Sequence, residues 1–443
     1  MCLGAGLLLA PAAGLAQVGS PAGPVPPELL RARRAAVMEA MGSGVALLPS
    51  AGMRSIEARG PHPQDSDFRQ DNDFFYLTGL ETPDSWLVLV ARADSADYAV
   101  LFLPARDSAA ERWTGPQLGP GAEATTLTGI GDVRPTDQAE RDIRSLVLGG
   151  GSPAWDEAGG LYVRRGDRGD ELNSEFIRSL IFPGIPRPMA VRDLGYVVAQ
   201  QRLIKDEDEL RRMRRAIDIT AEAEREAMKS LAGGQWEYQV EALIEYVFRR
   251  NGAERVGFPS IVGAGANSTT LHYDKSRGAL ADGDLIIMDI GAEFGYYSAD
   301  VTRTAPVSGR FTERQRRLYR LVLATQQAAI DSVRPGVTVR RLNRIARDYL
   351  RANSGDLCAP GDCNRYFVHG LSHWLGLDVH DLGDYRTALA PGMVLTVEPG
   401  LYLPDERIGI RIEDDILVTD GGHEILSAGA PRTPEDIERL MAR

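Results

Sequence analysis

The segment LIIMDIGAEFGYYSADVTRTAPV, residues 285–307, contains two apolar runs that are separated by Phe294 and Gly295. Apolar runs of this length that are bounded by a break predict a pair of β-strands. Asp289 and Asp300 lie inside the two runs, although an unpaired charge is costly to bury. Either carboxylate taken alone is most simply a residue that faces solvent. The pair becomes informative only together with other residues of the chain.

Two further acids and one histidine occupy comparable positions downstream. Glu398 ends the strand-like run VLTVE (394–398), Glu413 lies inside IRIEDD (410–415), and His373 precedes both in the chain. A divalent metal cluster would compensate four such carboxylates. A hard, oxygen-rich donor set with one imidazole suits manganese, cobalt or iron better than structural zinc. Two metals that share bridging carboxylates would activate a water and stabilise a tetrahedral intermediate.

Helical and strand-like segments alternate along this half of the chain. Asp206 and Glu209 have the spacing of a capping box, and Thr312 is placed to cap a later helix. Four arginines, at 211, 212, 214 and 215, follow the acids at 206–209, a charge run that favours a solvated helix face. A helix pair followed by strands occurs twice, which predicts a duplicated α/β unit whose halves share one sheet. The expected helices cover residues 207–233, 237–251, 313–333 and 338–352, and the expected strands cover 285–293, 296–307, 393–398 and 408–419.

The length of 443 residues predicts two or three domains. The segment SWLVLVARADSADYAVLFLP (85–104) contains two apolar runs joined by a polar stretch, which predicts a β-hairpin. A boundary falls near residues 192–204. We therefore expect an α/β (α+β) protein of two domains, a smaller one at 28–195 and a larger one at 200–443.

Composition limits the partners that the protein can have. The chain has 50 Lys and Arg against 62 Asp and Glu, a net charge of −12. This acidic balance argues against nucleic acid, because phosphate backbones need clustered positive charge. Three cysteines are too few for a disulfide scaffold or a cysteine-rich zinc module.

The first 27 residues differ in composition from the rest of the chain. Residues 1–16, MCLGAGLLLAPAAGLA, carry no charge and resemble a secretory signal with a cut before Gln17. The apolar run is too short for a membrane span and is broken by Pro11. We expect an exported protein, periplasmic or secreted, with a Pro-rich linker at 17–27. Without a functional signal the protein would be cytoplasmic.

Cys358 and Cys363 are the two cysteines that remain after such a cut. They lie five residues apart in DLCAPGDCN, with Pro360 and Gly361 between them. In an oxidising compartment the pair could close a small loop as a disulfide, and in the cytosol both would be free thiols.

The string HGLSHWLGLDVHD (369–381), with LTVEPGLY (395–402) and IGIRIEDD (408–415), closely resembles aminopeptidase P, the Xaa-Pro aminopeptidase branch of the pita-bread metallopeptidases. MDIGAEFGYYSADVTRT (288–304) is similar to the two-aspartate hairpin of that family, and SIVGAGANSTTLHY (260–273) is similar to its upstream histidine segment. The N-terminal RQDNDFFYLTGL also looks like its first domain. The resemblance covers most of the chain from about residue 30 onward, and it implies a pita-bread catalytic domain behind an aminopeptidase P-like N-terminal domain.

The resemblance implies two divalent metal ions, most simply Mn²⁺. Asp300 and Glu413 would bridge both metals, and Asp289 would complete one of the two sites. His373 and Glu398 would complete the other, and Glu398 would also act as general base and acid.

The resemblance also implies residues that act on the substrate. His272, His369 and His380 match family histidines that contact substrate near the scissile bond. Arg411 matches an arginine that holds a carboxylate ligand in place. Tyr402 is a weaker candidate for the same supporting role.

The implied activity is release of the N-terminal residue from peptides with proline in second position, through a hydroxide that bridges two metals. A prolidase, restricted to Xaa-Pro dipeptides, is the nearest alternative. A non-catalytic peptide-binding relative would lack several of the five ligands. The family also implies a homo-oligomer, a dimer or tetramer, and no membrane or nucleic acid partner is expected.

Overall fold

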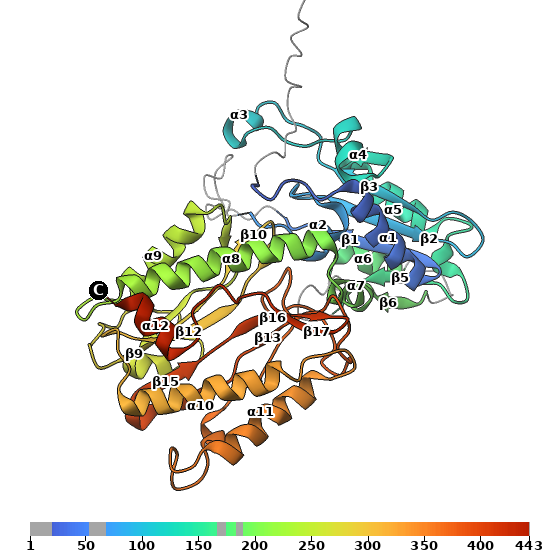
Figure 1. The fold of residues 1–443 in the computed structure, drawn as a ribbon. Coiled ribbons are helices and arrows are strands. Elements are labelled where there is room, and N and C mark those ends of the chain that lie inside the picture. The colour runs from blue at the N-terminus through green and yellow to red at the C-terminus, as the bar shows by residue number, and fades with distance from the viewer. Residues whose placement is uncertain (1–19, 53–67, 166–173, 183–188, 443) are drawn as a thin grey trace, which may run out of the picture. The chain divides into compact units, whose positions relative to one another are not determined.

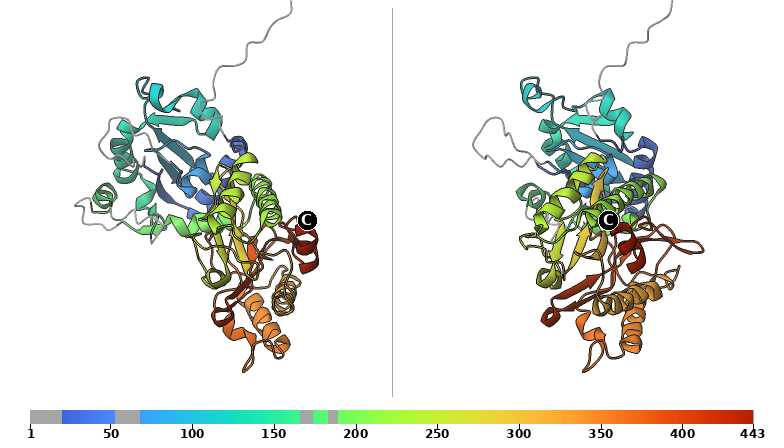
Figure 2. Two further views of the ribbon diagram at one scale, coloured as in Figure 1. Left: turned by 90° about the vertical axis from the view of Figure 1, so that its left-hand side faces the viewer. Right: turned by 60° about the vertical axis from the view of Figure 1, so that its left-hand side comes forward.

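The computed structural model describes residues 20–52, 68–165, 174–182 and 189–442 (Figures 1 and 2). The chain divides into two compact units, Met1–Val198 and Ala199–Arg443. Both units combine helices with strands, so the predicted α/β fold class is confirmed. The predicted signal sequence lies outside the described residues.

The first unit is built on a six-stranded mixed sheet with the strand order β4-β3-β2-β1-β5-β6. β2 and β3 pair antiparallel, which confirms the predicted hairpin. Alternate residues of the central strands, among them Val45, Val88 and Val100, pack with Ile143 and Ile177 from two helices on one face of the sheet. The elements of this unit are α1 (Pro27–Met41), β1 (Gly44–Pro49), α2 (Asn72–Thr78), β2 (Trp86–Ala91), β3 (Tyr98–Leu103), α3 (Glu111–Thr114), α4 (Ala122–Thr128), β4 (Asp132–Pro135), α5 (Ala139–Leu148), β5 (Leu161–Val163), α6 (Glu175–Ile181) and β6 (Val191–Asp193), and α7 (Leu194–Leu203) follows them.

The second unit contains two helix pairs, α8 with α9 and α10 with α11. The Asp206 side chain accepts from the N–H of Glu209, and the Glu209 side chain accepts from the N–H of Asp206, so the predicted capping box is confirmed. Thr312 caps α10 in the same reciprocal way with Gln315. The helices are α8 (Glu207–Ser230), α9 (Glu237–Arg250), α10 (Glu313–Ile330), α11 (Val339–Asn353) and α12 (Pro434–Met441). The strands are β7 (Arg255–Val256), β8 (Ile261–Ala264), β9 (Leu285–Ile290), β10 (Ala292–Phe294), β11 (Tyr297–Ser298), β12 (Val301–Pro306), β13 (Val394–Val397), β14 (Gly400–Leu403), β15 (Ile408–Arg411), β16 (Asp414–Thr419) and β17 (Gly422–Ile425).

The prediction that the two halves of this unit share one sheet is wrong. Strands β8, β9 and β12 form one sheet, while β13, β16 and β17 form another and β14 pairs only with β15. One backbone bond, from the N–H of Glu413 to the carbonyl of Thr302, joins β12 to the segment after β15, and side chains of β12 bond the neighbouring backbone groups. The Thr304 hydroxyl donates to the carbonyl of Arg411 (2.8 Å) and accepts from its N–H (3.1 Å), and the Arg303 guanidinium donates to the carbonyl of Glu413 (2.5 Å). These bonds satisfy the buried backbone without a continuous ladder.

The expected solvated face on α8 is wrong for Arg212. Its side chain is 1% exposed, because α8 packs this surface against the rest of the unit. Asp208, one turn earlier, lies 2.7 Å from the Arg212 guanidinium and compensates its charge. A buried arginine without such a partner would be strongly destabilising.

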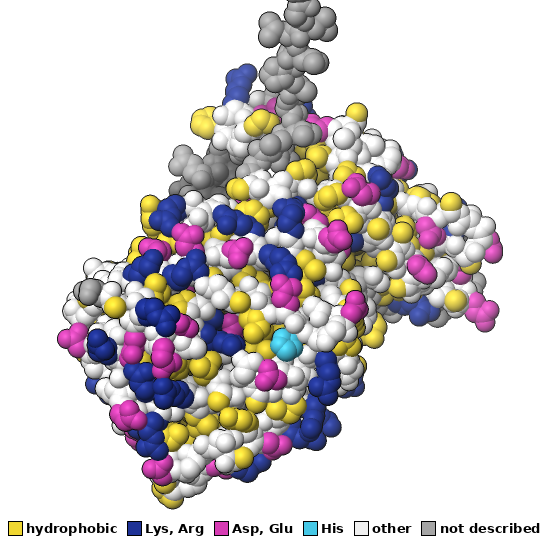
Figure 3. All heavy atoms as spheres, in the orientation of Figure 1, with side chains coloured by type: hydrophobic (Ala, Val, Ile, Leu, Met, Phe, Trp, Pro, Cys, Tyr) yellow, Lys and Arg dark blue, Asp and Glu magenta, His cyan; other side chains and the backbone are white. Residues whose placement is uncertain are grey.

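Two features of the described chain concern membrane crossing and the distribution of surface charge. No helix among the described residues combines the length and the apolar character needed to cross a membrane. On the face of the molecule in Figure 3, basic and acidic side chains are interspersed rather than gathered by sign.

Candidate metal centre

Asp289 and Asp300 approach each other because β9 and β12 pair antiparallel. Residue 289 lies opposite Thr302 in this ladder, and Asp300 immediately precedes β12. Both aspartates are nearly buried, at 7% and 4% exposure. The backbone N–H of Asp300 donates to a carboxylate oxygen of Asp415 at 3.1 Å, which fixes the start of the strand.

His373 faces three carboxylates. Its Nε2 lies 3.2 Å from Asp300, 3.6 Å from Glu398 and 3.9 Å from Glu413. The other ring nitrogen, Nδ1, lies 3.0 Å from the carbonyl of Trp374. A proton on Nδ1 donated to that carbonyl leaves the Nε2 lone pair directed at the carboxylate cluster, as in a metal-ligating histidine.

Two threonines hold the carboxylates in place. The Thr302 hydroxyl donates to Oε2 of Glu413 at 2.5 Å, and the N–H of Glu413 donates to the carbonyl of Thr302 at 3.1 Å. On the other strand, the Thr396 hydroxyl accepts from the N–H of His373 at 3.1 Å and lies 3.4 Å from Oε1 of Glu398. The sequence analysis did not identify either threonine. Their spacing, two residues after Asp300 and two before Glu398 in β-strand sequence, places each on the same face as its neighbouring acid.

The donor set fits divalent metal ions. Donor atoms of Asp300, His373 and Glu413 all lie within 4.8 Å of one another. Among the described residues, the buried Oδ1 atoms of Asp289 and Asp300 have no hydrogen-bond partner. Burial and the neighbouring carboxylates raise the pKa of Asp300 and of Glu413 well above their usual values. Such a cluster is unstable as a set of anions, and divalent cations would compensate its charge.

Arg411, Tyr402 and His369 form a chain of hydrogen bonds beside the carboxylates. Arg411 donates to Asp289 (2.5 Å) and to the Tyr402 hydroxyl (2.7 Å). The Tyr402 hydroxyl lies 2.9 Å from Nε2 of His369, and Nδ1 of His369 lies 3.5 Å from Glu398. Burial raises the pKa of Tyr402 to about 12 and lowers that of His369 to about 4. Both groups are therefore neutral at pH 7, so Tyr402 donates its proton to Nε2.

The cluster lines a cavity of about 820 Å³, a volume typical of ligand sites. His272 and His380 also line this cavity, and both side chains are exposed at its rim. The ring of His380 lies edge-on to that of His373 with centroids 4.4 Å apart. Nine of the ten candidate residues of the sequence analysis therefore line one cavity: Asp289, Asp300, His373, Glu398, Glu413, His272, His369, His380 and Arg411. The tenth, Tyr402, lies behind them and contacts Arg411 and His369.

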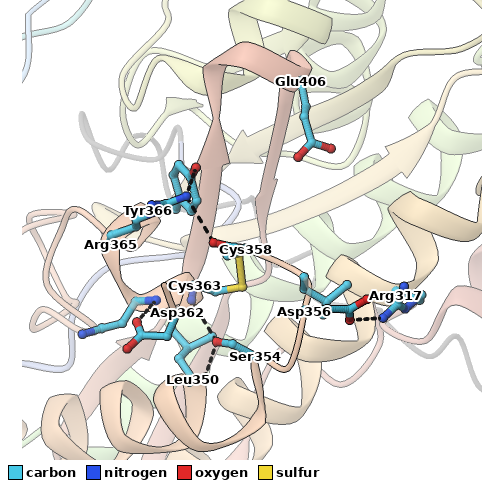
Figure 4. The surroundings of a disulfide bond; sticks show 12 residues. Arg317, Leu350, Ser354, Asp356, Cys358, Asp362, Cys363, Arg365, Tyr366 and Glu406 are labelled. Atoms are coloured by element: carbon cyan, nitrogen blue, oxygen red, sulfur yellow. Dashed lines mark hydrogen bonds and ion pairs between the residues drawn. A yellow bond between two sulfur atoms is a disulfide. The ribbon is translucent and has the colours of Figure 1, made fainter. Parts of the chain in front are cut away.

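A disulfide joins Cys358 and Cys363 in the segment before His369 (Figure 4). Both cysteines are buried. The Ser354 hydroxyl accepts from the N–H of Cys363 at 2.8 Å and donates to the carbonyl of Leu350 in α11 at 2.5 Å. Of the two alternatives that the sequence left open, the structure has the bonded form.

Two family models match the chain. The model for "Metallopeptidase family M24" matches residues 211–420, and that for "Aminopeptidase P, N-terminal domain" matches residues 30–152. The curated Xaa-Pro aminopeptidase of Escherichia coli strain K12 is 36% identical over 439 residues, which cover 92% of this chain and 96% of that protein.

Solved structures are similar over nearly the whole chain. The structure of proline aminopeptidase P II from Yersinia pestis has a TM-score of 0.85 at 34% identity and covers 94% of this chain and 100% of its own. Zinc-substituted E. coli aminopeptidase P in complex with product has a TM-score of 0.83 at 34% identity, with coverages of 95% and 99%.

Proposed function

The chain belongs to metallopeptidase family M24, in its aminopeptidase P branch, and we propose that it releases the N-terminal residue from peptides whose second residue is proline. It is a peptidase, and its second unit has the pita-bread fold of the solved aminopeptidase P structures.

The carboxylate cluster in the cavity is the observation that carries this proposal. Asp289, Asp300, His373, Glu398 and Glu413 supply oxygen and imidazole donors around one space, and two of the buried oxygens have no other partner. We propose that these five residues hold two divalent ions, most simply Mn²⁺. When bound, such ions supply Lewis acidity for the scissile carbonyl and a nucleophile derived from water at neutral pH.

Glu398 is placed to move protons in this reaction. Burial raises the pKa of its carboxyl, which favours acceptance of a proton from the attacking water. The same carboxyl would then deliver the proton to the proline nitrogen of the leaving group. Nδ1 of His369 lies 2.8 Å from the carbonyl of Gly370, which can only accept, so this bond holds the ring in place 3.5 Å from Glu398.

His272 and His380 would contact the peptide, because they lie at the rim of the cavity rather than among the carboxylates. Arg411 orients Asp289 through its short hydrogen bond and links that ligand to Tyr402. An arginine in this position fixes a carboxylate ligand and partly balances its charge.

Relative rates on an Xaa-Pro dipeptide and an Xaa-Pro-Xaa tripeptide of the same first residue test the proposal. Faster turnover of the tripeptide, with the cut between the first residue and proline, supports an aminopeptidase. Turnover of the dipeptide alone identifies a prolidase. Binding of the tripeptide without hydrolysis by metal-loaded protein identifies a peptide-binding protein.

We further propose that the protein is exported, to the periplasm or outside the cell. The Cys358–Cys363 disulfide supports this location, since disulfides persist mainly in oxidising compartments. Isolation from the native host, followed by N-terminal sequencing and a thiol count under denaturing conditions, tests it. An N-terminus near Gln17 with no free thiol is expected, and an intact Met1 with both Cys358 and Cys363 free would contradict export. Assembly into a dimer or tetramer stays a prediction.

A further inference from the structure

Arg347 lies in the middle of α11, and its guanidinium binds one segment of chain at three points. Nη1 donates to Oδ1 of Asn364 (3.0 Å) and to the carbonyl of Phe367 (3.1 Å), and Nη2 donates to the carbonyl of His369 (3.0 Å). The guanidinium carbon also lies 4.6 Å from the centroid of the Phe367 ring. One side chain therefore fixes the backbone on both sides of residue 368.

The end of this segment enters the catalytic cavity. Phe367 lies edge-on to the ring of His369, with centroids 5.0 Å apart. The His369 ring in turn contacts the Tyr402 hydroxyl and lies 3.5 Å from Glu398. By holding the carbonyl of His369, Arg347 fixes the peptide group that joins His369 to Gly370. The carbonyl of Gly370 lies 2.8 Å from Nδ1 of the His369 ring, so a rotation of this peptide group would remove the bond that orients the ring.

The start of the segment is anchored independently of Arg347. The disulfide closes the loop before Asn364, and the Ser354 hydroxyl joins the N–H of Cys363 to α11 (Figure 4). Arg365 donates to the carbonyl of Cys358 at 3.1 Å. Loss of the Arg347 bonds therefore frees mainly residues 367–369.

The packing of α11 is also independent of Arg347. The buried face of this helix is formed by Leu342, Ala346 and Leu350, and α11 packs with α10. The Arg347 side chain lies outside this apolar face and is half-buried. Its replacement removes polar bonds to the segment and leaves the hydrophobic contacts of the helix in place.

We infer that Arg347 is a positioning residue for the peptidase reaction, one that sets the orientation of the His369 ring toward Glu398. This inference rests on the proposed function. A displacement of about 1 Å in a positioned group can lower the rate by about 100-fold, so a side chain with no substrate contact can have a large effect.

Arg347→Met tests the inference, because methionine keeps an unbranched side chain and removes every donor. The expected result is a kcat about 10- to 100-fold lower, with KM and metal content within about twofold of the original protein. Arg347→Lys retains the charge but cannot reach all three acceptors at once, so it should recover part of the lost kcat. Arg344→Met, an exposed position one turn earlier on α11, is the matched control and should leave kcat unchanged.

A double-mutant cycle with His369→Ala separates positioning from a general structural effect. If Arg347 acts through His369, adding Arg347→Met to His369→Ala should lower kcat by less than about twofold. The inference would be overturned if adding Arg347→Met lowered the kcat of the His369→Ala variant by the same factor as it lowers the kcat of the wild-type protein. Wild-type kcat in Arg347→Met, or a loss of bound metal from it, would also overturn it.

NMR spectra of isotopically labelled histidine rings give a readout that needs no activity. The chain has six histidines, and the His369 signals are identified by their absence in His369→Gln. In Arg347→Met the His369 signals should shift while those of His423 do not. Unchanged His369 signals would overturn the inference. If the His369 signals shift in Arg347→Met but the wild-type protein does not cleave Xaa-Pro peptides, only the proposed function would be contradicted.

Discussion

Replacement of Glu398 by glutamine removes the carboxyl that we propose to transfer protons, while the shape of the site is kept. The carboxyl lies 3.4 Å from the Thr396 hydroxyl and 3.5 Å from Nδ1 of His369, and a glutamine amide can occupy the same volume with its oxygen toward Thr396. The other four proposed ligands are unaltered, so metal should remain bound. What is lost is the ability to take a proton from water and return it to the leaving nitrogen. A positioned acid or base contributes about 10²- to 10⁴-fold, which is about 2.7–5.4 kcal/mol of transition-state stabilisation.

The assay is steady-state hydrolysis of an Xaa-Pro-Xaa tripeptide by metal-loaded protein, with metal content measured on the same sample. Glu398→Gln should show kcat lower by at least about 100-fold with KM nearly unchanged. Glu406→Gln is the matched control, because Glu406 pairs on the surface with Arg314 and lies outside the cavity. Near-wild-type kcat in Glu398→Gln with full metal content would refute the assigned role.

Three further predictions concern buried charges and the disulfide. Glu224 is fully buried on α8, its carboxylate oxygens have no side-chain partner among the described residues, and burial raises its pKa well above the usual value. As the pH rises above about 4.3, Glu224 ionises in the unfolded chain but stays protonated in the folded protein. The free energy of unfolding therefore falls by up to about 1.4 kcal/mol per pH unit until the pH reaches the pKa of Glu224 in the folded protein. Glu224→Gln should gain stability over the original protein as pH rises from 4 to 7, measured by urea denaturation of metal-free samples, and a pH-independent difference would contradict this. Arg303→Met should lower the free energy of unfolding by about 3–5 kcal/mol in the same assay, because the buried Asp414 carboxylate loses the guanidinium 2.6 Å away. A decrease below about 1 kcal/mol would contradict a stabilising role for this ion pair. The double variant Cys358→Ser, Cys363→Ser should lower the free energy of unfolding by about 2–3 kcal/mol, because the unfolded chain gains loop entropy. It should still hydrolyse a tripeptide, since neither cysteine is a proposed metal ligand. A loss of bound metal from this variant would contradict that expectation.

The proposed ligands could be predicted from sequence because they violate a physical expectation. Asp289 and Asp300 are charged residues inside apolar strands, and such positions need a compensating partner. Thr302 and Thr396 do not violate any expectation, since threonine is common in strands. Their function depends on which acid lies beside them after folding, and only the structure shows that.

The sheet arrangement and the roles of Arg212 and Arg347 could not be predicted from the sequence for a related reason. Repetition of helices and strands indicates duplicated units, but it does not indicate whether edge strands pair or are bridged by side chains such as Thr304 and Arg303. Arg212 and Arg347 look like other arginines on amphipathic helices. The role of Arg212 depends on Asp208, one helical turn earlier. The role of Arg347 depends on a segment about 20 residues later in the chain, which includes His369.

The metal content of the purified protein shows whether the five proposed ligands bind two divalent ions. Protein stripped with a chelator, reloaded with Mn²⁺ and freed of excess metal by gel filtration would be measured by mass spectrometry against protein concentration. We expect about two Mn²⁺ per chain, and about one or none in an Asp300→Asn variant, which lacks the carboxylate proposed to bridge the two ions. Less than one metal ion per reloaded wild-type chain would contradict the account.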